Sequence, residues 1–113
     1  MQDIQAHLNH YPVSAQKVRL VIDLVRGKGA NEALEMLRFE TKSPASDVHK
    51  LLASAVANAE ENFGVSRDDL YVAKIFANEA PTRKWRRFGA RGRFKPLLRR
   101  SSHVTVILRE RGS

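Results

Sequence analysis

The chain has 113 residues, of which 42% are hydrophobic, and these values fit one globular domain with a modest core rather than a disordered basic tail. It contains no cysteine, which excludes disulfides, thiolate metal sites and thiol catalysis. Its 20 Lys and Arg residues against 12 Asp and Glu give a net charge of +8. We expect a single domain over residues 1–113.

The first third of the chain predicts a strand followed by two helices. Residues 3–11 alternate loosely between apolar and polar, which favours a short strand. Ser14 is a potential N-cap for a helix that continues to a stop at Gly27 and Gly29. A second helix is expected from about Asn31 to Glu40. The first helix repeats apolar residues at helical spacing: Val18, Val21, Ile22 and Val25.

A third, longer helix is expected next. Ser43 and Pro44 form an N-cap followed by proline at the first helical position, and Gly64 provides the stop. One face of the intervening helix carries the residues expected to be buried: Val48, Leu52, Ala55 and Ala59.

Two alternating segments, residues 70–80 and 101–110, predict strands on either side of a basic stretch. In the first strand we expect Tyr71, Ala73, Ile75 and Ala77 to share one face. In the second we expect Val104, Val106 and Leu108 to share one face. Because the glycines near residues 89–92 permit a turn, the basic stretch is expected to fold into a hairpin with arms of about 30 Å.

Basic residues are concentrated in this stretch. Residues 82–100 contain seven Arg, two Lys and no acidic residue, which gives +9, whereas the rest of the chain has 11 basic and 12 acidic residues, which gives −1. A cationic block of this kind usually meets phosphate, and less often an anionic membrane surface. Arginine binds phosphate with its planar fork and also stacks on bases. The interleaved Trp85, Phe88 and Phe94 either stack on RNA bases or pair across the hairpin, with equal weight.

The sequence offers little support for catalysis or for a metal. The four histidines (His7, His10, His49 and His103) are scattered, without the spacing of metal ligands. No nucleophile has an obvious base, and no glycine-rich phosphate loop follows a strand. We therefore predict no catalytic residue, no metal and no cofactor. The N-terminal segment lacks the features of a signal peptide, and no apolar run is long enough to span a membrane, so we expect a cytoplasmic protein.

Four segments together resemble the family of the twenty-second protein of the bacterial large ribosomal subunit. They are "SAQKVRLVIDLVRGK" (14–28), "SAVANAEEN" (54–62), "LYVAKIF" (70–76) and "GRFKPLLRRSSHVTVIL" (92–108). The resemblance covers nearly the whole chain, in order and without large gaps.

The resemblance implies an α/β (α+β) fold in which three helices pack on a three-stranded antiparallel sheet, with a long protruding β-hairpin at about residues 79–103. It also implies a structural, non-enzymatic constituent of the large subunit that binds 23S-type rRNA, contacts several rRNA domains and supports early subunit assembly. The hairpin is expected to line the exit tunnel, beside neighbouring ribosomal proteins and the nascent polypeptide. No membrane partner and no homo-oligomer are expected.

The basic residues and the segments that match the family together predict two sets of site residues. The predicted rRNA-binding residues are Ser14, Lys17, Arg19, Arg26, Lys28, Arg83, Lys84, Arg86, Arg87, Arg91, Arg93, Lys95, Arg99, Arg100, Ser102 and His103. The candidates for the tunnel tip or for stacking are Trp85, Phe88, Gly89, Ala90, Gly92 and Phe94. The chain departs from the family pattern at Trp85, at Phe88-Gly89 in place of the usual Pro-Arg, and at Leu8-Asn9 in the first strand. The resemblance therefore carries no rRNA contact over to that strand.

Three other functions compete with this one. An independent RNA- or DNA-binding regulator would share the basic hairpin but would not associate stably with ribosomes. A membrane-active hairpin would need a continuous apolar face. The basic residues here occupy both odd-numbered and even-numbered positions, and so both faces, of the two arms. An enzyme has the weakest support.

Overall fold

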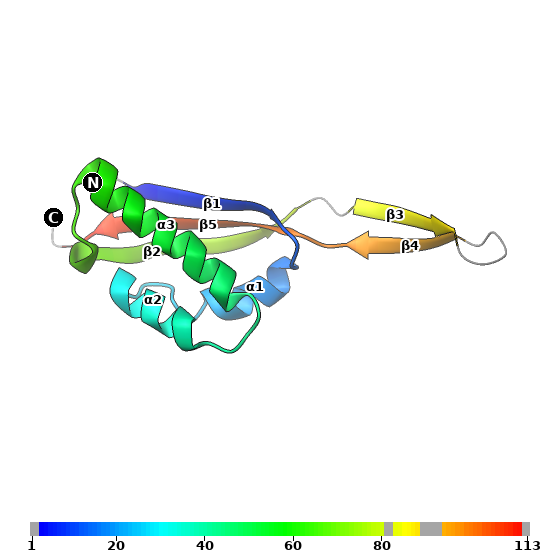
Figure 1. The fold of residues 1–113 in the computed structure, drawn as a ribbon, viewed down its shortest axis with the longest axis horizontal. Helices are drawn as coiled ribbons and strands as arrows, with labels where there is room; N and C mark the ends of the chain where they lie inside the picture. Colours follow the sequence, from blue (N-terminus) through cyan, green and yellow to red (C-terminus); the bar gives the residue numbers. More distant parts are fainter. Residues whose placement is uncertain (1–2, 81–82, 89–93, 112–113) are drawn as a thin grey trace.

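The computed structural model describes residues 3–80, 83–88 and 94–111 as an α/β body from which a two-stranded hairpin extends (Figure 1). The strands are β1 (Ile4–Tyr11), β2 (Leu70–Glu79), β3 (Arg83–Phe88), β4 (Phe94–Arg99) and β5 (Ser102–Glu110). The helices are α1 (Ala15–Ile22), α2 (Ala30–Phe39) and α3 (Ala45–Phe63), with a short 3-10 turn at Arg67–Asp69. The predicted order of elements is confirmed.

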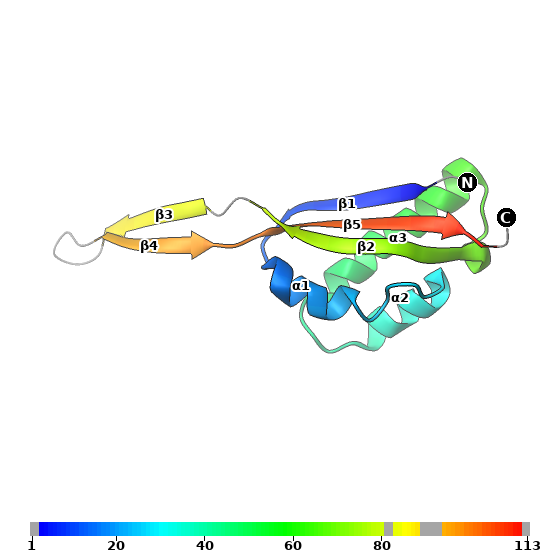
Figure 2. The same cartoon turned by 180° about the vertical axis from the view of Figure 1, so that it is seen from behind.

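The body is a three-stranded antiparallel sheet with strand order β1-β5-β2. All three helices lie on one face of this sheet, and the view from behind shows the other face uncovered (Figure 2). The predicted fold class, three helices packed on a three-stranded antiparallel sheet, is confirmed.

The core lies between the sheet and the helices. Val104, Val106 and Leu108 of the central strand are fully buried, as the alternation predicts. The predicted inner face of α3 is also confirmed, because its four residues are inaccessible to solvent. Two of these are alanines, and small residues let a helix approach a sheet closely. The four are Val48, Leu52, Ala55 and Ala59.

Helix α1 ends four residues earlier than predicted. It begins after Ser14, whose hydroxyl accepts a hydrogen bond from Lys17 N, but its last residue is Ile22 rather than a residue next to Gly27. Turns follow, in which Val25 remains fully buried. The apolar spacing therefore marked a buried face correctly but overestimated the length of the helix.

The ends of α3 show one small difference. Pro44 is the N-cap itself, and the helix begins at Ala45, one residue later than the Ser43 cap predicted. The predicted stop is confirmed, because Gly64 caps the helix with a φ of 66°. A left-handed residue at this position commonly ends helices, and glycine adopts it without steric cost.

A β-bulge in β2 corrects the predicted faces of that strand. Val72 pairs with Leu108 and Lys74 with Ile107, so Ala73 is the extra residue. The alternation changes parity at this point: Leu70 and Val72 are buried before the bulge, and Ile75 and Ala77 after it. The prediction that Tyr71 and Ala73 share a face with Ile75 and Ala77 is therefore wrong.

The hairpin continues directly from the two long strands of the body. Glu79 pairs with Ser102, Ala80 N donates to Ser101 O at 3.0 Å, and the ladder resumes at Arg83 and Arg99. The described chain extends 65 × 26 × 18 Å along its principal axes. Its radius of gyration of 17.3 Å exceeds the roughly 13 Å of a compact domain of this size, because the hairpin projects from the body.

Candidate nucleic-acid interface

The register of the hairpin places cationic residues opposite one another. Arg83 pairs with Arg99, and Arg87 pairs with Lys95, along an antiparallel ladder that runs from Arg83 to Phe88. Like charges at directly opposed positions destabilise a two-stranded ribbon, and an isolated ribbon is at best marginally stable in water. An anionic partner would relieve this repulsion between the two strands and stabilise the ribbon.

The remaining predicted hairpin residues lie in the same ladder, where Trp85 pairs with Leu97 and Phe88 pairs with Phe94. Lys84, Trp85, Arg86 and Phe88 belong to β3, and Phe94 belongs to β4. The predicted turn, with Gly89, Ala90, Arg91, Gly92 and Arg93, lies outside the described residues.

The basic residues of α1 and the turn after it divide into two groups. Lys17 and Lys28 are exposed. Arg19 and Arg26 are also exposed, but their guanidinium groups bind carbonyl oxygens along the outer edge of β2. Arg19 donates from Nε and Nη2 to Ala77 O, at 3.2 and 2.8 Å.

These two arginines help cover an edge strand. Arg26 Nη2 donates to Ile75 O at 2.8 Å, while Gly27 N donates to Val72 O and Lys28 O accepts from Val72 N. An uncovered edge presents free backbone groups to other chains, and natural proteins block such edges with loops and charged side chains. The bulge at Ala73 shifts the alternation of β2 by one residue. After it, the backbone carbonyls that face the open edge of the sheet are therefore those of odd-numbered residues, such as Ile75 and Ala77. Arg19 and Arg26 therefore have a structural role that charge alone does not reveal.

We expect Arg19→Gln to lower the free energy of unfolding by about 1 kcal/mol, because glutamine cannot reproduce the two-donor contact with Ala77 O. Lys17→Gln removes the same charge from the same helix without loss of an edge contact, so it is expected not to lower the free energy of unfolding. Urea unfolding of both variants measures the difference. Equal stability of the two variants would show that the edge contact contributes nothing.

Two predicted residues at the base of the hairpin lie within the body. Ser102 is fully buried in the central strand, and its Oγ has no hydrogen-bond partner among the described residues. We therefore do not carry Ser102 into the proposed interface. His103 is half-buried, and its Nδ1 accepts a hydrogen bond from His10 N at 3.1 Å. The two histidine rings meet edge to face with centroids 4.7 Å apart, so His103 is held against the bulge in β1.

Other predicted residues are brought together from distant parts of the sequence. Ser14, Lys17 and Arg100 line one hollow of ≈ 820 Å³ beside the base of the hairpin. Lys42 and Ser43, from the loop between α2 and α3, line it too. Sequence reasoning missed these two residues, because one lysine and one serine in a loop carry no signal of their own.

Three arginines of the described body form ion pairs with acidic side chains. Arg26 binds Asp23, Arg67 binds Glu60, and Arg109 binds Asp3. The hydrogen bond from Arg109 lowers the pKa of Asp3 below its usual value, and the one from Arg67 does the same for Glu60. Because the folded pKa is lowered, any stabilisation from these exposed pairs is present above the unfolded pKa. It is lost as the pH falls through the folded pKa.

One partly buried polar contact is structural. The Tyr11 hydroxyl donates to Asp47 Oδ2 at 2.5 Å, and burial raises the pKa of this hydroxyl well above its usual value. The contact joins β1 to the first turn of α3. Within the described ranges, no group of three or more histidine, aspartate or glutamate side chains could hold a metal ion.

Comparison with known proteins identifies first the class and then the family. Residues 6–109 match the family described as Ribosomal protein L22p/L17e, which places the chain among the ribosomal proteins. The chain is also 46% identical over 107 residues to the large ribosomal subunit protein uL22 of Pediococcus pentosaceus, a match that covers 95% of this chain and 91% of that relative. The chain therefore belongs to the L22p/L17e family.

This membership confirms three predictions. The chain is a structural constituent of the large ribosomal subunit, it is a ribonucleoprotein component, and it is not an enzyme. The described helices include none that is both long and apolar enough to cross a membrane.

Proposed function

We propose that this protein binds 23S-type rRNA of the large ribosomal subunit through its hairpin and the adjoining basic surface of the body. The hairpin contacts several rRNA domains, supports early subunit assembly and lines the wall of the nascent-peptide exit tunnel. Its partners there are neighbouring large-subunit proteins and the growing polypeptide.

The observation that carries this proposal is the combination of charge and shape in one segment. Residues 82–100 hold nine basic side chains and no acidic one. The described part of this segment forms a two-stranded ribbon that projects from the sheet (Figure 1). An extended polyanion such as RNA can neutralise both strands of the ribbon along their length.

The basic residues near α1 extend the interface onto the body. Lys17 and Lys28 are exposed, and Ser14, which caps the start of α1, lines the same hollow as Lys42 and Arg100. Arg19 and Arg26 remain candidates for rRNA contacts, because a guanidinium group has five N–H donors and the edge of β2 uses only some of them.

The test is the salt dependence of binding between the intact chain and protein-free large-subunit rRNA. If the hairpin neutralises about six phosphates, log K should fall with log salt concentration at a slope of about −4 to −5, with the single-strand coefficient. A filter-binding series from low to high salt measures this slope. A slope near zero would contradict the proposal.

A further inference from the structure

We propose that the hollow at the base of the hairpin is a second binding site for the rRNA backbone, with Lys42 as its central cation. This inference rests on the proposed function and adds a contact that neither the sequence motifs nor the family match assigns. The residues that define this basal hollow are Ser14, Lys17, Leu20, Lys42, Ser43 and Arg100.

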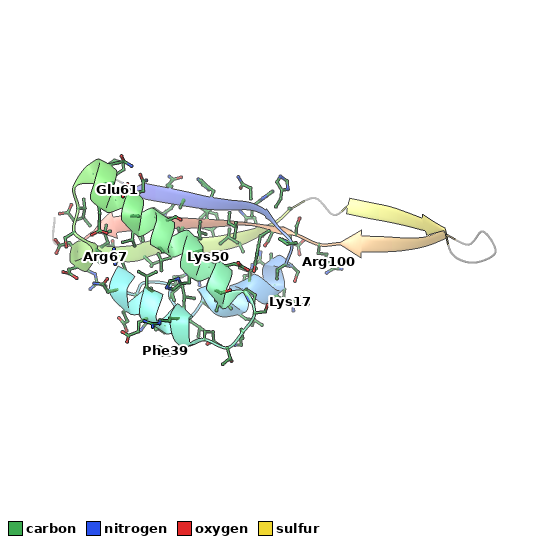
Figure 3. The ribbon with its side chains drawn as sticks, in the orientation of Figure 1. Lys17, Phe39, Lys50, Glu61, Arg67 and Arg100 are labelled. Atoms are coloured by element: carbon green, nitrogen blue, oxygen red, sulfur yellow. The ribbon has the colours of Figure 1, made fainter. Side chains whose placement is uncertain are left out.

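The first support is charge. Lys17, Lys42 and Arg100 come from three separate segments of the chain, and no acidic side chain is found among the described residues that line the basal hollow. Figure 3 shows Lys17 and Arg100 near each other where the hairpin leaves the body. All three side chains are exposed, and the ion pairs of the described residues involve none of them. A solvated surface usually mixes both signs of charge, so three cations around one hollow favour an anionic ligand.

The second support is the start of α1. The helix begins at Ala15, has no acidic residue in its first turn, and carries Lys17 there. The N-terminus of a helix has a partial positive charge, so a cation in the first turn is unfavourable unless an anion lies nearby. A phosphate in the basal hollow would satisfy both the helix end and Lys17.

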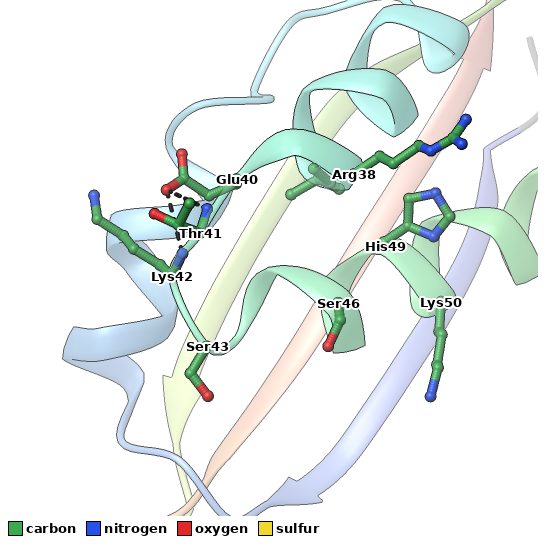
Figure 4. A pocket seen from close by; sticks show the side chains of 9 residues that line it. Arg38, Glu40, Thr41, Lys42, Ser43, Ser46, His49 and Lys50 are labelled. Atoms are coloured by element: carbon green, nitrogen blue, oxygen red, sulfur yellow. Dashed lines mark hydrogen bonds between the residues drawn. The ribbon is translucent and has the colours of Figure 1, made fainter.

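The third support is that the backbone of Lys42 is fixed in place. Glu40 Oε1 accepts hydrogen bonds from Thr41 N and Lys42 N, at 3.1 and 3.3 Å (Figure 4). Lys42 O accepts from Ala45 N at 3.0 Å, which ties the loop to the first residue of α3. The carboxylate of Glu40, two residues before Lys42, is therefore engaged by the backbone of the loop, and the exposed Lys42 is held on an anchored backbone.

The shape of the surface favours a nucleic-acid strand over a small anion. Lys42 and Ser43 also line a second hollow of ≈ 610 Å³, together with Arg38, His49 and Lys50. Its one acidic residue among those described is Glu40, whose Oε1 already accepts hydrogen bonds from the loop backbone. Basic side chains thus continue from Arg100, at the end of the hairpin, across the α2–α3 loop and onto α3 (Figures 3 and 4). A strand of RNA that leaves the hairpin can follow this series with successive phosphates, whereas a free phosphate ion would use only one hollow.

The test compares Lys42→Gln with Lys74→Gln in the rRNA-binding series. Both variants lose one exposed lysine, but Lys74 lies in β2, away from the basal hollow. Loss of one phosphate contact should reduce the salt slope by about 0.7 and weaken binding about fourfold at physiological salt. We expect this change for Lys42→Gln and none for Lys74→Gln.

The outcomes separate this inference from the proposed function. If the unaltered chain binds with a steep slope and the two variants behave alike, the basal hollow is not a phosphate site and the hairpin proposal stands. If the unaltered chain shows no salt-dependent binding, both proposals fall.

A second measurement locates the RNA directly. Because the chain has no cysteine, Ser43→Cys introduces a unique thiol that can carry an iron chelate for hydroxyl-radical cleavage of bound rRNA. Glu61→Cys, at the far end of α3, is the control (Figure 3). We expect discrete rRNA cleavage from position 43 above the background of position 61. Cleavage from position 43 no greater than this background would overturn the inference.

Discussion

Replacement of Arg83, Arg86, Arg87 and Arg99 together by glutamine is expected to reduce the affinity for large-subunit rRNA on the order of 10²-fold at physiological salt. Each lost phosphate contact should lower the magnitude of the salt slope by about 0.7, so four should lower it by about 3. The effect on affinity is large because these residues lie on opposed strands of one ribbon, where Arg83 faces Arg99 in the ladder. The measurement is the filter-binding series described above.

A matched variant with lysine at the same four positions keeps the charge and removes the planar guanidinium groups. It should retain the slope of the unaltered chain, and any loss of affinity then measures the bidentate geometry of arginine. Thermal unfolding of both variants should be unchanged, because the described core cluster is formed by residues between 4 and 77 and between 104 and 108. A steep slope that persists in the glutamine variant would remove the hairpin from the interface.

The largest effect on stability is expected for Leu108→Ala, which should lower the free energy of unfolding by about 2–5 kcal/mol. Leu108 is fully buried in the central strand, where it pairs with Ile4 on one side and Val72 on the other. Truncation therefore leaves a cavity at the junction of all three strands, beneath the helices. Urea unfolding monitored by circular dichroism gives the change.

The control is Phe76→Ala, in which a larger side chain is removed from a position that is 38% exposed. Its cost should be well below that of Leu108→Ala, because the surface it loses is already partly in water. Equal costs for the two variants would mean that the covered face of the sheet does not hold the main core.

The sequence predicted the order of elements and most of the buried face, because burial repeats with the period of a helix or strand. It failed at Ala73, because a bulge inserts one residue without changing the alternation of residue types on either side. The early end of α1 at Ile22 was missed for a related reason, since Val25 stays buried in a turn and continues the apolar pattern.

The interface was predictable where charge is concentrated along the chain and not where it is assembled in space. The nine basic residues of segment 82–100 are evident from the sequence alone. Lys42 lines the same hollow as Lys17 and Arg100 only because α3 begins beside α1 at the base of the hairpin. No local pattern in the sequence indicates this packing. Likewise, nothing in the composition of α1 distinguishes Arg19, which binds the edge of β2, from Lys17, which does not.

The most direct test of the claim that rRNA lies along the hairpin uses Trp85, the single tryptophan of the chain, which belongs to β3. Its fluorescence can be quenched with acrylamide in the free chain and in the complex with large-subunit rRNA. We predict that the quenching constant falls several-fold in the complex and recovers at the salt concentration that releases the RNA. Stable rRNA binding that leaves Trp85 as accessible as in the free chain would contradict the account, because the body alone would then hold the RNA.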